Sequence, residues 1–80
     1  MAQAIGRFIV VDARVCHGAP TFRGTRILVA DVLDQVANGI SWDAIIENWR
    51  GAVSHEAIAE SVRLAREVLM NHQEDLVPAR

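Results

Sequence analysis

The chain has no lysine, and its 80 residues include only one cysteine, two prolines and four aromatic side chains. A single cysteine, Cys16, cannot form a disulfide within the chain, which favours a reducing compartment. No apolar run approaches the length of a membrane-spanning helix, and residues 1–7 lack the pattern of a secretory signal. These absences predict a cytoplasmic protein with no membrane segment.

The residue spacings of common catalytic and metal sites are missing as well. There is no C-x-x-C or H-x-x-x-H spacing and no phosphate-binding Gly-Lys-Ser/Thr ending. Cys16 and His17 are neighbours, and neighbours in an extended strand point to opposite faces, so they cannot act as nucleophile and base. A metal site would need ligands from scattered places: Cys16, His17, His55 and His72. We therefore predict no catalytic residue, no metal and no cofactor, and a protein that is not an enzyme.

The size of the chain predicts one small domain that needs a partner. A chain of this length buries only about 60% of its unfolded surface, so its core is thin. Yet 51% of the residues are hydrophobic and no disulfide reinforces the fold. We expect further burial against another molecule, most simply a second copy in a homodimer.

Charge is distributed unevenly along the chain. Residues 1–30 carry four arginines and one acid, a net charge of +3, whereas residues 31–80 carry four arginines and nine acids, a net charge of −5. The fork of donors on arginine suits carboxylates and phosphates. The positive end is suited to nucleic acid or an acidic partner, and the negative end to a basic partner; ordinary solvated helix faces explain the charges equally well.

Residues 8–29 predict a short β element. Phe8–Asp12 is rich in β-branched residues and reads as a strand, and residues 26–29 read as a second strand. Gly18, Pro20 and Gly24 predict turns between them, because glycine adopts backbone angles that other residues avoid and proline fixes its own φ. Such a pair of strands must pack on helices or on a dimer partner to be stable.

Residues 30–76 predict three helices. The first runs from Ala30 or Asp31 to Asn38 and stops at Gly39. Ser41 and Ser54 are suited to cap the second and third helices. The second ends at Gly51, and the third ends between residues 71 and 75. Residues 77–80 are expected to form a tail.

The helical residues also predict how the helices pack. Trp42, Ile46 and Trp49 follow helical spacing and read as core or dimer anchors. The third helix keeps an apolar stripe over several turns: Ile58, Ser61, Val62, Ala65, Val68 and Leu69. The short turn at residues 50–53 is compatible with a helix-turn-helix. The fold class we predict is mostly α, with a trihelical helix-turn-helix-like (homeodomain-like) body behind the N-terminal β element, in a single domain over residues 1–80.

The motif that joins the two parts resembles that of a known family. The residues Gly18-x-Pro20 and Gly24-Thr25-Arg26-Ile27-x-Val29, followed by Gly39 and Ser41, are similar to the signature of the bacterial and archaeal family called domain of unknown function 433. The resemblance spans about Val10 to Ala65. The chain departs from the family pattern at His17 and Ala19, and residues 48–51 lack a Tyr-Pro pair.

The resemblance implies a function in protein binding. Members of that family are regarded as antitoxin-like and are often encoded beside a PIN-type ribonuclease toxin. The resemblance therefore implies a non-enzymatic antitoxin that binds such a toxin and represses its own operon as a dimer. The alternative is a stand-alone helix-turn-helix DNA-binding regulator, and a small enzyme or ligand-binding domain ranks last.

The candidate site residues fall into two groups. The family motif comprises Gly18, Pro20, Gly24, Thr25, Arg26, Ile27 and Val29. Its backbone N–H groups are candidates for a phosphate cradle, but a structural role in the hairpin is the better prediction. We expect Arg26 to pair with an acid, Asp31 or Asp34 of its own chain or an acid of a second copy.

The second group comprises candidates for contact with DNA or toxin: Arg23, Arg50, His55 and Arg63. If the third helix entered the major groove, Glu56 and Glu60 would repel phosphates. Glu60, Glu67 and Glu74 are spaced to share one helix face, which reads either as a mimic of nucleic-acid charge or as an ordinary solvated face.

Overall fold

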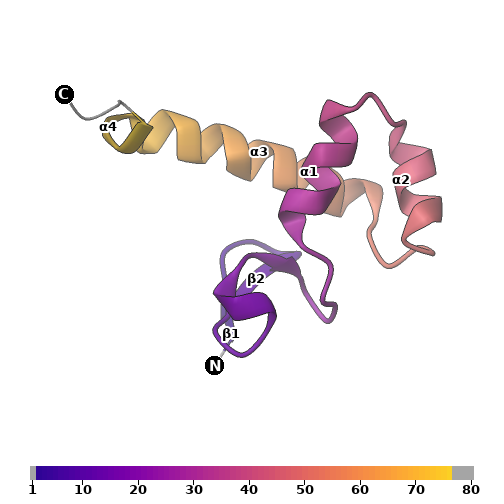
Figure 1. Cartoon of the computed structure of the whole chain (residues 1–80), viewed down its shortest axis with the longest axis horizontal. Helices are drawn as coiled ribbons and strands as arrows, with labels where there is room; N and C mark the ends of the chain where they lie inside the picture. The colour runs from indigo at the N-terminus through magenta and orange to yellow at the C-terminus, as the bar shows by residue number, and fades with distance from the viewer. Residues whose placement is uncertain (1, 77–80) are drawn as a thin grey trace.

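The computed structural model describes residues 2–76. The chain begins with a three-stranded antiparallel sheet in the order β1–β2–β3 (Figure 1). The strands are β1 (Ala2–Ala4), β2 (Ile9–Asp12) and β3 (Thr21–Phe22), and a 3-10 turn, η1 (Cys16–Gly18), connects β2 to β3. Gln3 pairs with Val11, and Ile9 pairs with Phe22.

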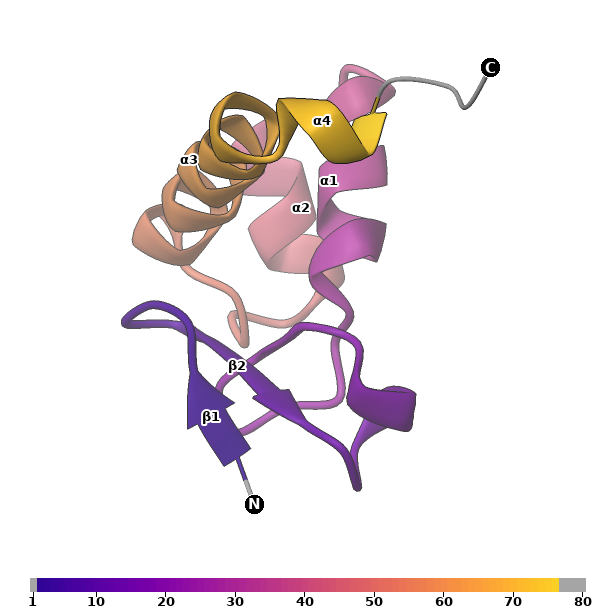
Figure 2. The same ribbon diagram turned by 90° about the vertical axis from the view of Figure 1, so that its left-hand side faces the viewer.

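Helices make up most of the remaining chain. They are α1 (Val29–Ala37), α2 (Trp42–Asn48), α3 (His55–Asn71) and the short α4 (Gln73–Leu76). Figure 1 shows α1, α2 and the start of α3 gathered beside the sheet, while the rest of α3 extends away from this body. In Figure 2, α4 turns off the end of α3 toward the side on which α1 lies. The prediction of a mostly helical chain behind an N-terminal β element is confirmed.

The helix boundaries follow from local capping. The Ser41 hydroxyl accepts a 3.1 Å hydrogen bond from the N–H of Ala44, and the Ser54 hydroxyl accepts one of 3.1 Å from the N–H of Ala57. Both serines are therefore the predicted N-caps. Gly39 follows α1 with a φ of +77°, a left-handed conformation that suits glycine at a helix end.

One hydrophobic core joins the sheet to the helices. Two strands, the first three α-helices and the connection between α2 and α3 contribute to it: Ile9, Phe22, Val29, Val32, Ile45, Val53, Ala57 and Ile58. Trp42, Ile46 and Trp49 are partly buried and pack against this core. The indole N–H of Trp49 donates a 2.7 Å hydrogen bond to the side-chain oxygen of Gln35, which ties α2 to α1. These three anchors therefore contribute to the packing of the chain's own core.

Two strand predictions are wrong. Residues 26–29 do not form a strand, because Leu28 makes only an isolated bridge to Thr21 and Val29 already begins α1. The strand that pairs with β2 is Thr21–Phe22 instead. The sequence also gave no indication of β1, because Ala2–Ala4 has low β propensity and owes its form to pairing with β2.

The backbone at Cys16 and His17 is not extended. Both residues have positive φ angles, 49° and 57°, inside the tight η1 turn. The prediction that Cys16 and His17 lie in an extended strand, on opposite faces, is therefore wrong. Within residues 2–76, no three His, Cys, Asp or Glu side chains gather closely enough to hold a metal ion. Over the same range, no helix is both long and apolar enough to cross a membrane. The predicted tail, residues 77–80, lies outside the described residues.

Candidate functional site

The family-like motif builds the loop that connects β3 to α1. The Thr25 hydroxyl donates to the carbonyl of Phe22 at 2.7 Å and accepts from the N–H of Ile27 at 3.0 Å. The Phe22 N–H in turn donates to the Ile27 carbonyl at 3.1 Å. Gly24, with a φ of +76°, makes the turn inside this closed loop. The geometry supports the structural interpretation of Gly24 and Thr25.

The same motif starts α1. The carbonyl of Pro20 accepts a 3.0 Å hydrogen bond from the N–H of Val29, one of the helix donors that has no partner within the helix. Val29 and the partly buried Ile27 then pack on the core. Pro20, Ile27 and Val29 thus fix the angle at which the sheet meets the helices.

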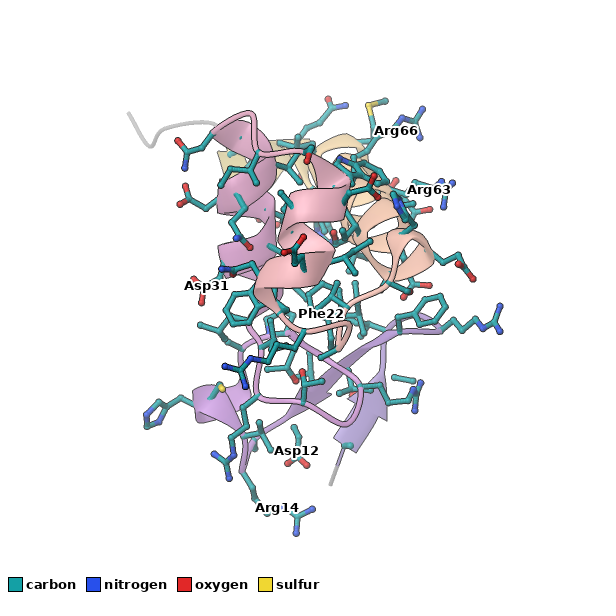
Figure 3. The ribbon with its side chains drawn as sticks, turned by 90° about the vertical axis from the view of Figure 1, so that its right-hand side faces the viewer. Asp12, Arg14, Phe22, Asp31, Arg63 and Arg66 are labelled. Atoms are coloured by element: carbon teal, nitrogen blue, oxygen red, sulfur yellow. The ribbon has the colours of Figure 1, made fainter. Side chains whose placement is uncertain are left out.

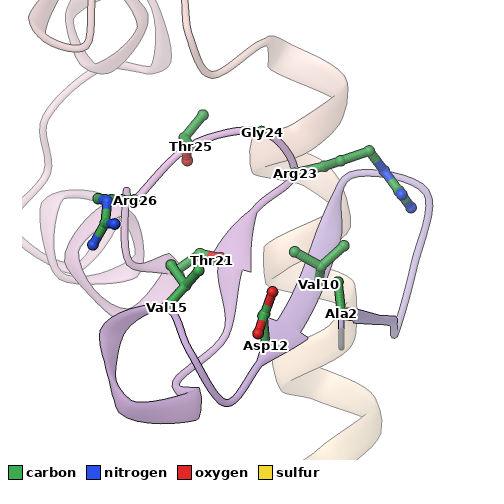
Figure 4. Close-up of a pocket in the computed structure, with 9 residues that line it drawn as sticks. All are labelled: Ala2, Val10, Asp12, Val15, Thr21, Arg23, Gly24, Thr25 and Arg26. Atoms are coloured by element: carbon green, nitrogen blue, oxygen red, sulfur yellow. The ribbon is translucent and has the colours of Figure 1, made fainter.

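A hollow of about 420 Å³ lies on one face of the sheet (Figure 4). Asp12 from β2 points into it, between Val10 and Thr21. The pKa of the Asp12 carboxyl lies below its usual value, chiefly because the backbone N–H of Arg14 donates a 2.9 Å hydrogen bond to it. Arg23 and Arg26 line the same hollow, so the Asp12 carboxylate lies among side chains of mixed charge.

Arg26 lies at the rim of this hollow, and its side chain is exposed (Figure 4). No carboxylate of residues 2–76 forms an ion pair with it, so the predicted pair with Asp31 or Asp34 of its own chain is wrong. Its backbone carbonyl accepts a hydrogen bond from the Cys16 thiol at 3.5 Å. The backbone of Arg26 therefore belongs to the loop, while its guanidinium faces solvent.

Glu60 of α3 holds the turn between β1 and β2. Its two carboxylate oxygens accept hydrogen bonds from the backbone N–H groups of Arg7, at 3.0 Å, and Phe8, at 2.8 Å. A Cβ atom at Gly6 would overlap this carboxylate, so the close approach depends on glycine. The sheet is therefore attached to α3 by a polar clamp as well as by the core.

Three arginines gather around this turn, and we call them the basic edge: Arg7, Arg23 and Arg63. The Arg23 guanidinium donates to the carbonyls of Arg7, at 3.0 Å, and Gly6, at 3.3 Å. The Arg7 guanidinium lies 5.1 Å from the centre of the Phe8 ring. Arg63 of α3 lines a shallow hollow together with Ile5 and Gly6. All three side chains are exposed.

The other two contact candidates lie apart from the basic edge. Arg50 follows α2 in a left-handed conformation, with a φ of 54°, and its side chain is exposed. His55, the first residue of α3, lies 2.7 Å from the Asp43 carboxylate and packs beside the Trp42 ring. The structure thus brings Arg23 and Arg63 together but separates them from Arg50 and His55.

The predicted acidic face of the third helix is formed only in part. Glu60 and Glu67 line the same hollow on α3, where Glu60 is directed to the β1–β2 turn. Glu74 belongs to α4, after α3 has ended at Asn71. The prediction that all three acids share one face of the third helix is therefore wrong.

The sequence did not indicate two features of this site. One is Arg7 as a member of the basic edge, and the other is Glu60 as the acceptor of hydrogen bonds from the β1–β2 turn. Arg7 lay before the first predicted strand, where no pattern placed it near α3. The pair Gly6-Arg7 was a weak turn signal. The partner of that turn lies 53 residues away in the sequence, and no local pattern identifies such a contact.

The comparisons with known proteins give a family and no function. The family model described as "Protein of unknown function (DUF433)" matches residues 9–65, more than half of the chain. This range agrees closely with the resemblance that the motif suggested. No curated protein and no solved structure matches the chain.

Proposed function

The chain belongs to the DUF433 family, and from this premise we propose that it is a non-enzymatic antitoxin-type module that binds a PIN-type ribonuclease toxin as a homodimer. Its partner is an acidic nuclease, and its mechanism is to cover that nuclease's active cleft. The association with a PIN-type toxin comes from the family resemblance. The structure of this chain supports the proposal with a basic surface that suits an acidic partner.

The observation that supports the proposal is the basic edge. Arg7, Arg23 and Arg63 come from the β1–β2 turn, the loop after β3 and α3, yet they surround one turn. Hydrogen bonds to backbone carbonyls hold Arg23, and the ring of Phe8 supports Arg7. Guanidinium groups held in place lose less side-chain entropy on binding than free ones.

A nuclease cleft lined by carboxylates is a suitable target for this edge. Arginine binds a carboxylate with two parallel hydrogen bonds, and such charge-assisted bonds are about twice as strong as neutral ones. Glu60 and Glu67 line the same hollow as Arg63, so the edge carries three arginines against two acids and keeps a net positive charge. The basic edge would therefore present donors to the cleft, and the body of the chain would block substrate.

We further infer that α2, residues 49–54 and α3 act as a helix-turn-helix, with operator DNA as a second ligand of the dimer. Arg50 and His55 lie where such a motif meets the duplex. However, His55 is held by Asp43, and Glu56 is exposed on the first turn of α3. These acids would face phosphates, so toxin binding is the better-supported activity.

The test uses the PIN-type ribonuclease encoded beside this chain's gene. We expect the purified chain to bind it and to inhibit its cleavage of RNA. Replacing both Arg7 and Arg63 with glutamate should weaken binding by at least about tenfold, as expected for the loss of charged contacts at an interface. Arg26→Glu is the matched control, because Arg26 is also exposed but lies outside the basic edge, and it should bind as the native chain does.

Other outcomes would contradict the proposal. If the folded chain neither binds nor inhibits that ribonuclease, the antitoxin assignment is wrong. If it binds only a duplex from upstream of its own gene, with an affinity that falls steeply with salt, the alternative of a DNA-binding regulator is correct. Arg50→Ala and Arg63→Ala would then be the variants that weaken binding.

A further inference from the structure

The apolar stripe of α3 is covered along only half of its length. Ile58, Ser61, Val62, Ala65, Val68 and Leu69 follow helical spacing and lie within an arc of about 120° on an ideal helix. Ile58 is 0% exposed and Ser61 is 1% exposed, because the helical body covers them. We call residues 55–61 the proximal half of α3 and residues 62–71 its distal half.

The same stripe faces solvent in the distal half. Val62 is 38% exposed, Val68 46% and Leu69 57%. Figure 1 shows this part of α3 beyond the end of the body, with neither α1 nor α2 beside it. Leu76 of α4, 54% exposed, adds to the apolar surface at the far end. An exposed apolar stripe on a helix is typical of a surface that binds another helix.

The distal half is long enough for one further helix to cross it. The ten residues of the distal half span about 15 Å, and an α-helix with its side chains is about 10–12 Å across. In Figure 2 the body lies at one end of the distal half, and α4 turns off its other end toward the side of α1.

Charged side chains of opposite sign lie around the exposed stripe, so the same surface on a second copy can complement it. Arg66, whose side chain points outward from α3 (Figure 3), lies near the middle of the distal half, whereas the acids Glu74 and Asp75 lie on α4, beyond its end. All three side chains are exposed, and Asp75 also lies 3.4 Å from His72. If two copies cross in opposite directions at a point between Arg66 and Glu74, Arg66 of each lies near the acids of the other. Parallel helices would bring like charges together.

We propose that the distal half of α3, together with α4, is the contact surface for a second copy of this chain, which crosses it in the opposite direction about a two-fold axis. The inference takes the homodimer from the proposed function and assigns it a surface. Trp42, Ile46 and Trp49 are not this surface, since they pack against the chain's own core. Arg63 of the basic edge belongs to the distal half but lies about 120° around the helix from Leu69, so a two-fold contact along the stripe leaves the basic edge of each copy free for the nuclease.

Sedimentation equilibrium of the full chain tests the surface. We expect a dimer, and we expect Leu69→Glu to raise its dissociation constant by at least about thirtyfold, as loss of a central apolar contact does. Glu67→Arg is the control: Glu67 is also exposed on α3 but lies about 160° around the helix from Leu69, opposite the stripe. It should leave the dissociation constant within about threefold of the native value.

Exchanging charges tests the direction of crossing. Arg66→Glu alone, and Glu74→Arg with Asp75→Arg, should each dimerise at least about tenfold more weakly, because like charges then face each other. An equimolar mixture of the two variants should recover the native affinity. Circular dichroism of each variant checks that the helices remain folded.

Three results would overturn the proposed surface: a native chain that stays monomeric, a Leu69→Glu variant that dimerises like the native chain, or a Glu67→Arg variant that is weakened equally. Binding to the ribonuclease separates this failure from failure of the proposed function. A chain that binds and inhibits the ribonuclease while remaining monomeric contradicts the surface and leaves the antitoxin function standing.

Discussion

The proximal and distal halves of α3 have the same kind of sequence and opposite surroundings. Both continue one apolar stripe at helical spacing. The proximal half supplies Ala57, Ile58 and Ser61, each at most 3% exposed, whereas Val68 and Leu69 of the distal half are about half exposed. The difference shows that a periodic pattern predicts a helix and its apolar face, but not what covers that face.

The distal half forms a helix although, after Leu64, which packs against the core, most of its side chains are exposed. Its residues include good helix formers such as Leu64, Ala65, Arg66 and Glu67. Isolated helices of this length are marginal in water, so continuity with the anchored proximal half supports it. A helix maintained in this way can present apolar side chains to a partner without first having to fold.

The largest effect should separate the two halves directly. Ile58→Ala removes a fully buried side chain from the core and should lower the free energy of unfolding by about 2–5 kcal/mol. Val68→Ala, on the same stripe, should change it by no more than about 0.5 kcal/mol in the monomer. Urea unfolding at low micromolar concentration measures both. Equal losses would mean that the distal half is covered within one chain.

An intermediate effect is expected at the clamp between the proximal half and the sheet. Glu60→Ala removes the acceptor of two backbone N–H groups and should cost about 1–3 kcal/mol. Gly6→Ala should cost a similar amount, because its new Cβ displaces the same carboxylate.

The double variant distinguishes a shared cause from two separate ones. If the clamp accounts for both losses, Gly6→Ala with Glu60→Ala should be little less stable than either single variant. Thermal unfolding of the four proteins completes this cycle. Fully additive losses would show that Gly6 and Glu60 stabilise the fold independently.

The smallest effect on the free energy of unfolding is expected at Asp12, which lies in β2, outside both halves of α3. Its pKa is lower in the folded chain than in the unfolded chain, so its contribution to stability is present above the ordinary pKa near 3.8. That contribution is lost as the pH falls through the lower, folded value. Asp12→Asn should therefore flatten the decline of stability below about pH 4. Unfolding curves between pH 5 and pH 2 test this, and an unchanged decline would contradict it.

Local signals in the sequence predicted the parts of the fold that local chemistry determines. Ser41 and Ser54 are caps because a hydroxyl one residue before a helix can accept an N–H inside it. Gly39 ends α1 because its left-handed φ suits glycine. The motif around Gly24 and Thr25 likewise indicated both the loop and the family.

Contacts between distant segments were not predictable in the same way. The strand at Ala2–Ala4 exists because β2 lies beside it, and the clamp joins Glu60 to a turn more than 50 residues away. Arg26 has the right charge to pair with Asp31, yet the loop directs its guanidinium to solvent. Each of these depends on how the sheet and the helices are placed relative to one another.

Hydrogen exchange along α3, measured at two protein concentrations, tests the contrast between its halves most directly. We expect the amides of residues 58–61 to be protected equally at both concentrations, since the chain's own core covers them. Protection of residues 66–71 should increase at the higher concentration, as a second copy covers the distal half. Protection of residues 66–71 that does not change with concentration would contradict the proposed dimer surface.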